Sequence, residues 1–298
     1  DPELKKEQAQ IVKTEQSKPS AGKPSAPSLN NKTKIPQKKI TRSEAVTSEL
    51  RVKLENSQIT GSISLNGGLI DDVTLKNYKE SLDKNSKQVV ILNPKKMGTG
   101  YYLESGWASA NNIEVPDNNS VWKLTRNRTL TPRSPIELEW ENKSGLIFQK
   151  KIELDDQYLF TVTESIKNNS KSNVDLFHYS QITRKEKPDT QNFYILHEGL
   201  VGVVDETLQE EGYDDIKDKN QKYQGTSGWF GITDKYWLTA IVPQKKQAFN
   251  AEFTYDTAYK ANYILTNPTS TRPGQTNSNS SQFFIGAKEV GVIDGYAK

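Results

Sequence analysis

The sequence predicts an all-β protein built as one large antiparallel β-sandwich. From Val46 onward, apolar and polar residues alternate with a period of two, which is typical of strands that bury one face. Clusters of Asn, Gly, Asp and Ser, which favour turns, separate the alternating stretches at a spacing of roughly ten residues. Before the last ten residues, no run of ten or more has a convincing helical period.

The expected strands and turns follow one another along the chain. The alternating stretches are 50–54, 59–65, 146–154, 158–162, 174–178 and 249–255. The expected turns are 66–68, 142–145, 155–156 and 168–170. Two segments interrupt the pattern. We expect residues 97–120 to form a long excursion rich in Gly and Asn, and residues 205–224 to be an acidic, then mixed segment with turn residues throughout.

Residues 1–45 are predicted to be a disordered basic linker ahead of a folded domain at 46–298. The linker contains no aromatic residue and five of the thirteen prolines, so it cannot bury enough apolar surface to offset the entropy of ordering. It carries ten Lys and Arg against five Asp and Glu, and the rest of the chain carries 30 against 32. The folded part is therefore near neutral and has no basic stripe, which argues against nucleic acid as a partner.

Composition excludes several kinds of site. The chain has no cysteine and two histidines, which excludes disulfides, thiol nucleophiles and metal centres built from thiolates or several histidines. It has no nucleotide-binding glycine loop, nucleophile elbow or calcium loop, so we expect no cofactor and no metal. Its apolar runs are about five residues long, against about 20 for a spanning helix. The chain starts at Asp1 without a methionine or signal peptide, which indicates a piece of a longer protein.

Three residues are candidates for general acid and base catalysis: His178, His197 and Glu198. His178 stands in phase with Leu176 in an alternating strand, which favours a core or near-surface position. His197 and Glu198 precede Gly199 and look like an ordinary pair at the end of a strand. We therefore expect no catalytic site.

Other polar and aromatic residues are interpreted structurally. The pairs Asp71-Asp72, Asp155-Asp156 and Asp214-Asp215 are predicted to be solvated carboxylates in turns. Tyr101, Tyr102 and Trp107 lie in the 97–120 segment, where they either line a groove for an extended chain or cover a face of a sheet. The second interpretation suits a sandwich better.

Longer motifs in the folded part point to a family. They are Asn66-Gly67-Gly68-Leu69-Ile70, Gly145–Lys150 followed by Asp155–Val162, His197–Val203, Gly228–Ile232 with Lys235–Pro243, and Phe283–Lys288. On these motifs, residues 46–298 resemble the large periplasmic domain of the YidC membrane protein insertase, in the form found in alphaproteobacteria. The family usually has Pro where Ala287 stands. The resemblance gives structural roles to Gly67, Gly68, Tyr158, His197, Glu198, Gly199, Gly228, Trp229, Tyr236, Pro243, Phe284, Gly286 and Lys288.

The resemblance implies a β-supersandwich similar to the galactose mutarotase fold, on the periplasmic side of the bacterial inner membrane. A short C-terminal helix, with Val290 and Ile293 at the junction, would lead to the second transmembrane segment. The implied function is non-enzymatic: an interaction domain of an insertase that helps membrane proteins insert, fold and assemble, alone or with the Sec translocon and SecD/SecF. Nascent membrane proteins would engage the membrane part.

Two alternatives stay open at this stage. One is a carbohydrate-binding or mutarotase-like enzyme on the same fold, because a fold does not fix a function. The other is a periplasmic chaperone that holds extended peptides.

Overall fold

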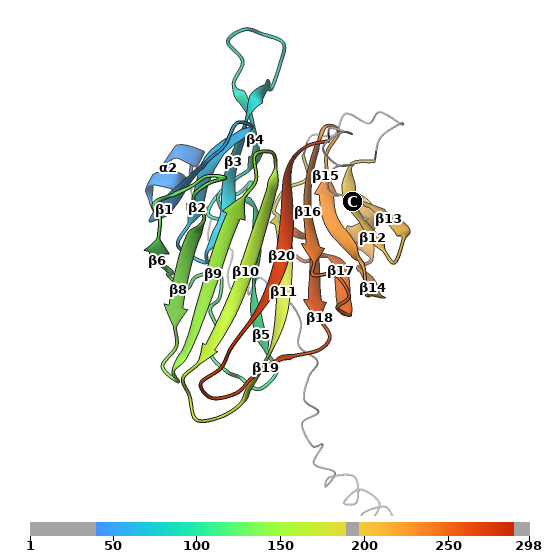
Figure 1. The fold of residues 1–298 in the computed structure, drawn as a ribbon. Helices are drawn as coiled ribbons and strands as arrows, with labels where there is room; N and C mark the ends of the chain where they lie inside the picture. The colour runs from blue at the N-terminus through green and yellow to red at the C-terminus, as the bar shows by residue number, and fades with distance from the viewer. Residues whose placement is uncertain (1–39, 189–196, 289–298) are drawn as a thin grey trace, which may run out of the picture.

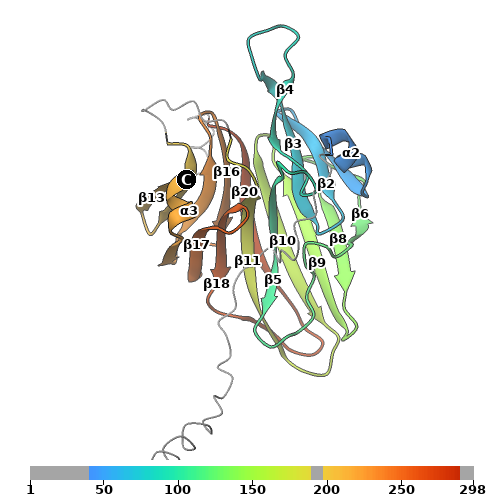
Figure 2. The same ribbon diagram turned by 180° about the vertical axis from the view of Figure 1, so that it is seen from behind.

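The computed structural model describes residues 40–188 and 197–288, which form two facing β-sheets (Figures 1 and 2). The predictions for residues 1–39 and for Val290 and Ile293 lie outside these ranges. The elements are α2 (Arg42–Thr47), β1 (Arg51–Glu55), β2 (Ile59–Ser64), β3 (Leu69–Lys79), β4 (Gln88–Leu92), β5 (Tyr101–Ser109), β6 (Lys123–Arg126), β7 (Thr129–Leu130), β8 (Ile136–Glu141), β9 (Leu146–Leu154), β10 (Leu159–Asn168), β11 (Val174–Arg184), β12 (Gly199–Val204), β13 (Thr207–Gly212), α3 (Tyr213–Asp218), β14 (Gln221–Gly225), β15 (Gly228–Thr233), β16 (Trp237–Pro243), β17 (Phe249–Tyr255), β18 (Tyr259–Leu265), β19 (Thr269–Thr271) and β20 (Thr276–Ala287).

The two sheets have eleven and nine strands. The larger runs in the order β14-β17-β18-β11-β5-β3-β2-β1-β7, with β4 paired to β3 and β19 to β11. The smaller runs β13-β12-β15-β16-β20-β10-β9-β8-β6. The described strand pairs are antiparallel except β1 with β7, which is parallel. The all-β sandwich predicted from alternation is therefore confirmed, and the chain crosses between the sheets several times, for example between β10 and β11.

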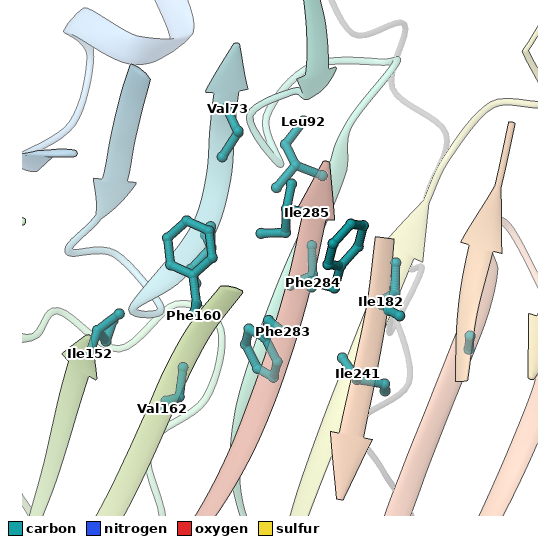
Figure 3. Packing of buried hydrophobic residues seen from close by; sticks show 14 of the residues in the cluster. Val73, Leu92, Ile152, Phe160, Val162, Ile182, Ile241, Phe283, Phe284 and Ile285 are labelled. Carbon is teal, nitrogen blue, oxygen red and sulfur yellow. The ribbon is translucent and has the colours of Figure 1, made fainter. Parts of the chain in front are cut away.

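The hydrophobic core lies between the sheets. Val73, Leu92 and Ile182 point inward from the larger sheet, and Phe160 and Phe283 approach from the smaller one (Figure 3). All five are at most 2% exposed. Burying a side chain of this size contributes about 1.5–3 kcal/mol, so the core supplies the main force that holds the two sheets together.

The prediction of a long excursion at 97–120 is wrong for the middle part of that segment. Residues Tyr101–Ser109 form β5, which lies between β3 and β11 near the centre of the larger sheet. Tyr101, Tyr102 and Trp107 are all buried in this strand. Both faces of β5 are covered, so its sequence lacks the alternation that marks a half-buried strand. The segment 205–224 also contains regular structure, namely β13, α3 and part of β14.

The pair Asp71-Asp72 is not a solvated turn, because both residues lie in β3 and are at most 5% exposed. Asp71 is an extra residue in the pairing with β2, where Ser62 faces Asp72 and Ile63 faces Ile70. Each carboxylate has an arginine partner: Arg51 pairs with Asp71 and Arg42 with Asp72. Alternation alone did not reveal these two ion pairs.

Arg42 also opens α2, inside the segment predicted to be linker. Thr41 and Glu44 form a capping box, in which the Thr41 backbone N–H donates to the Glu44 carboxylate at 2.7 Å. Arg42 donates to the hydroxyl of Thr74 at 2.8 Å, and Ala45 is buried. Residues 41–45, which were predicted to be linker, thus belong to the folded part of the chain.

Gly286, at the end of β20, provides a test of the packing around the buried Tyr158. A Cβ at this position would lie 2.3 Å from Cγ of Tyr158, whose ring packs edge-on against Phe284. We expect Gly286→Ala to lower the free energy of unfolding by about 1–3 kcal/mol, because overpacking displaces a buried ring. Urea unfolding measures this change.

Gly98→Ala is the matched control, because a Cβ there meets nothing within 4 Å. Its stability should stay within about 0.5 kcal/mol of the wild type. Equal stabilities of the two variants would contradict the packing argument.

Candidate functional site

Three charged or titratable side chains meet between the sheets. Lys150 comes from β9, Glu164 from β10 and His178 from β11. Nζ of Lys150 lies 3.2 Å from one carboxylate oxygen of Glu164, and Nε2 of His178 lies 2.6 Å from the other. All three side chains are at most 2% exposed. We call Lys150, Glu164 and His178 the buried triad.

Strand periodicity explains why these residues point inward. Lys150 stands in phase with the buried Phe148 and Ile152, and Glu164 in phase with Val162 and Ile166. Alternate residues of a strand face the same side of the sheet. The triad residues therefore face the core from positions that otherwise hold apolar side chains.

Residues in the walls of the site provide further interactions for the ammonium group of Lys150. Its ammonium donates to the carbonyl of Ser105 at 2.9 Å and lies 5.3 Å from the centre of the Trp122 ring. Gly68 permits this approach, because a Cβ there would be 3.2 Å from Nε1 of Trp122 and its φ is +61°. Across the site, the Trp107 ring meets His178 edge-on at 5.2 Å.

Lys150 and His178 control the ionisation of Glu164. Burial alone would raise its pKa, but Lys150 and His178 favour the carboxylate and together lower the pKa below the ordinary value. The pKa of Glu104 shifts in the opposite direction. Its carboxylate accepts a hydrogen bond from Gln181 at 2.8 Å, yet burial dominates and raises its pKa.

A small cavity of about 10 Å³ adjoins the triad. Its walls include Glu104, Trp107, Trp122, Glu164 and Tyr179. A cavity of this size holds about one water molecule. In this conformation the Glu164–His178 pair has the chemistry of a general acid and base, but a sugar ring has no space beside it.

His197 and Glu198 do not pair with each other. Nε2 of His197 lies 2.8 Å from the carbonyl of Leu200, and the Glu198 carboxylate accepts the backbone N–H of Lys235 at 3.0 Å. Each side chain therefore fastens the start of β12 locally. Gly199 follows them, and a Cβ there would be 2.5 Å from the carbonyl of Glu211.

The other motif residues lie in the smaller sheet or its turns, except Gly67, which lies in a turn of the larger sheet. Gly228 tolerates no side chain, because a Cβ would be 1.9 Å from the carbonyl of Val203. Lys288 donates to the hydroxyl of Thr233 at 3.1 Å. Gly67 turns the chain between β2 and β3 with a φ of +83°. The remaining motif residues are the half-buried Trp229, the exposed Tyr236 in the β15–β16 turn, and Pro243 at the end of β16.

Sequence reasoning placed His178 in a strand but missed Lys150 and Glu164. The signal was present: each is a charged residue on the apolar face of an alternating stretch. A charge in such a position almost always has a buried partner. The partners lie on different strands, so the sequence pattern could not pair them.

No helix in the described residues is long and apolar enough to span a membrane. Within 40–188 and 197–288 no group of three or more His, Cys, Asp or Glu side chains could hold a metal ion.

Solved structures define the class of the fold. A galactose mutarotase-like protein from Lactobacillus casei superimposes with a TM-score of 0.53 at 8% identity, over 80% of this chain and 100% of that one. A galactose mutarotase related enzyme from Lactobacillus acidophilus gives 0.52 at 10% identity, over 80% and 97%. The chain thus has the galactose mutarotase-like architecture that the resemblance implied.

The chain belongs to the family of YidC periplasmic domains, whose model matches residues 51–298. The membrane protein insertase YidC of Pelagibacter ubique is 42% identical over 261 residues, 87% of this chain and 47% of that protein. That of Mesorhizobium japonicum is 38% identical, over 86% of this chain and 44% of the relative. The resemblance seen in the sequence is confirmed. The chain spans about half the length of these relatives.

Lys150→Met tests the buried triad. Removing one partner leaves the buried carboxylate of Glu164 with less compensation, so we expect a loss of about 3–5 kcal/mol in the free energy of unfolding. Lys151→Met is the control, because Lys151 forms an exposed pair with Glu153 that is worth about 0.5 kcal/mol. Urea unfolding of both variants decides the point, and similar losses would refute the role of the triad.

Glu104 generates a prediction about pH. Its raised pKa means that the folded state binds the proton more tightly, so stability is lost as pH rises from the unfolded value near 4.5 through the folded pKa. Glu104→Gln removes this loss. Its stability relative to the wild type should therefore increase with pH across that window, as measured by urea unfolding at several pH values. A difference independent of pH would contradict the assignment.

Proposed function

We propose that the chain is the periplasmic interaction domain of an inner-membrane protein insertase and foldase. The observation that carries this proposal is the match of residues 51–298 to the YidC periplasmic domain, together with relatives that are named membrane protein insertases. In this role the domain contacts partner proteins on the periplasmic side of the inner membrane, and the membrane part of the insertase engages nascent membrane proteins.

The burial of the Glu164–His178 pair and the exposure of apolar side chains at the margin support a binding role over a catalytic one. The Glu164–His178 pair is sealed between the sheets beside a cavity of about 10 Å³. Exposed apolar side chains stand on elements at the margin of the sandwich. Leu82 is fully exposed at the tip of the β3–β4 hairpin, and Leu208 is 56% exposed on β13, the outermost strand of the smaller sheet. An edge strand can accept a strand from a partner protein.

The proposed partners are SecD/SecF and subunits of the Sec translocon. In the full-length protein in its native membrane, a photo-crosslinking residue at position 208 or 82 should yield products with these proteins. The same photo-crosslinking residue in place of Lys53, on the inner strand β1, is the control. It should yield fewer products with these proteins. Absence of Sec products from positions 82 and 208, with the protein at normal abundance, would argue against this partnership.

A mutarotase-like enzyme is the second candidate, favoured by the fold and by the Glu164–His178 pair. We propose that the domain has no such activity, because the pair has no room for a sugar. Aldose mutarotation should match the uncatalysed rate. A faster rate that disappears in His178→Gln or His197→Ala would establish the enzyme instead.

A further inference from the structure

Three loops meet at the lower end of the sandwich in Figure 1: residues 142–145 between β8 and β9, 169–173 between β10 and β11, and 272–275 between β19 and β20. Asn168 joins them. Its backbone N–H donates to the carbonyl of Gln275 at 2.9 Å, and its side-chain amide donates to the carbonyls of Ser172 and Thr271, both at 2.8 Å.

The connections continue beyond Asn168. The carbonyl of Asn168 accepts the N–H of Gly274 at 2.7 Å, and the N–H of Asn169 donates to the carbonyl of Gly145 at 2.9 Å. Asn168 itself is fully buried. The three loops therefore form one surface with a fixed arrangement.

This surface carries a net positive charge. Lys143, Lys167, Lys171 and Arg272 are all exposed, and none forms an ion pair with a carboxylate of the described residues. Residues 142–145, 167–173 and 272–275 contain no Asp or Glu. We call these four cations the basic tip.

The basic tip contrasts with the rest of the folded part. Residues 46–298 carry 30 Lys and Arg against 32 Asp and Glu, so the positive charge here is segregated and not a general property. Two exposed carboxylates flank the loops along the chain, Glu141 at the end of β8 and Asp175 near the start of β11, so the four cations of the tip outnumber them. Asp175 already accepts a hydrogen bond from the hydroxyl of Ser270.

The chemistry of the basic tip suits carboxylates. Lysine offers a compact positive charge with three donors, and arginine can bind a carboxylate with two parallel hydrogen bonds. The tip lies at the end opposite to the one where β20 finishes (Figure 1). The resemblance implies that the chain after β20 leads to a transmembrane segment, and in the proposed function the tip then points away from the lipid headgroups of that membrane.

We propose that the basic tip is a docking surface for an acidic segment of a partner protein. The surface selects by charge: clustered Asp and Glu side chains of the partner lie against Lys143, Lys167, Lys171 and Arg272. The orientation away from the membrane rests on the proposed function, whereas the charge, the exposure and the fixed loops do not.

The binding test uses the 298-residue chain and a fluorescent peptide of ten glutamates as the probe. The triple variant Lys143→Gln, Lys171→Gln, Arg272→Gln removes three cations of the tip. A matched triple, Lys53→Gln, Lys151→Gln, Lys222→Gln, removes the same charge from exposed residues that have carboxylate partners. Thermal unfolding verifies that both triples fold, and fluorescence anisotropy measures the affinity at several salt concentrations.

We expect the tip triple to weaken binding at least about tenfold at low salt, and the matched triple to weaken it less than about threefold. The salt dependence of binding should become shallower in the tip triple only. Equal losses in the two triples would overturn the proposal, because binding would then follow net charge. Binding to vesicles containing phosphatidylglycerol that is tighter than peptide binding, and lost in the tip triple, would also overturn it in favour of a lipid surface.

These outcomes are independent of the Sec crosslinks. Loss of the crosslinks with intact peptide binding would refute the partners in the proposed function and leave the basic tip in place. Intact crosslinks with no effect of the tip triple would refute the basic tip alone.

Discussion

A single buried carboxylate organises the interior of this sandwich. The carboxylate of Glu164 contacts the ammonium of Lys150 on the adjacent strand and the imidazole of His178 on the facing sheet. A charge away from water is costly unless it is paired and hydrogen-bonded. The fold is therefore constrained to keep β9, β10 and β11 in one relative position, in which Lys150 and His178 both reach the same carboxylate.

This constraint also fixes strand register. In the pairing of β9 with β10, Lys150 lies directly opposite Glu164. A slip of one residue would turn one of them to the outside of the sheet and leave the other unpaired in the core. The hydrophobic side chains around the triad also oppose a slip of one residue, but a slip of two residues would leave them facing the core and would still move Lys150 away from Glu164. The charged residues distinguish the native register from its neighbours.

The same architecture serves different functions in different proteins. Galactose mutarotase-like proteins share the fold with this chain at 8–10% identity, and likeness of fold at that level says nothing about activity. Here the acid and base groups are closed off between the sheets. The groups that remain available to partners are edge strands, a protruding hairpin and the basic tip. That division between a sealed interior and an accessible margin supports the proposed role as an interaction domain.

The sequence by itself determined the fold class, because alternation in strands such as β9 and β10 reports which face is buried, whatever the partner strand. It also determined the family, through long motifs such as Gly228–Ile232. It could not identify β5, whose two faces are both covered, or the pairing of Asp71 with Arg51. Only the tertiary structure decided which charges meet. Lys150 and Glu164 are 14 residues apart along the chain, as are Glu164 and His178. Their contact depends on how two strands of one sheet pack against a strand of the other.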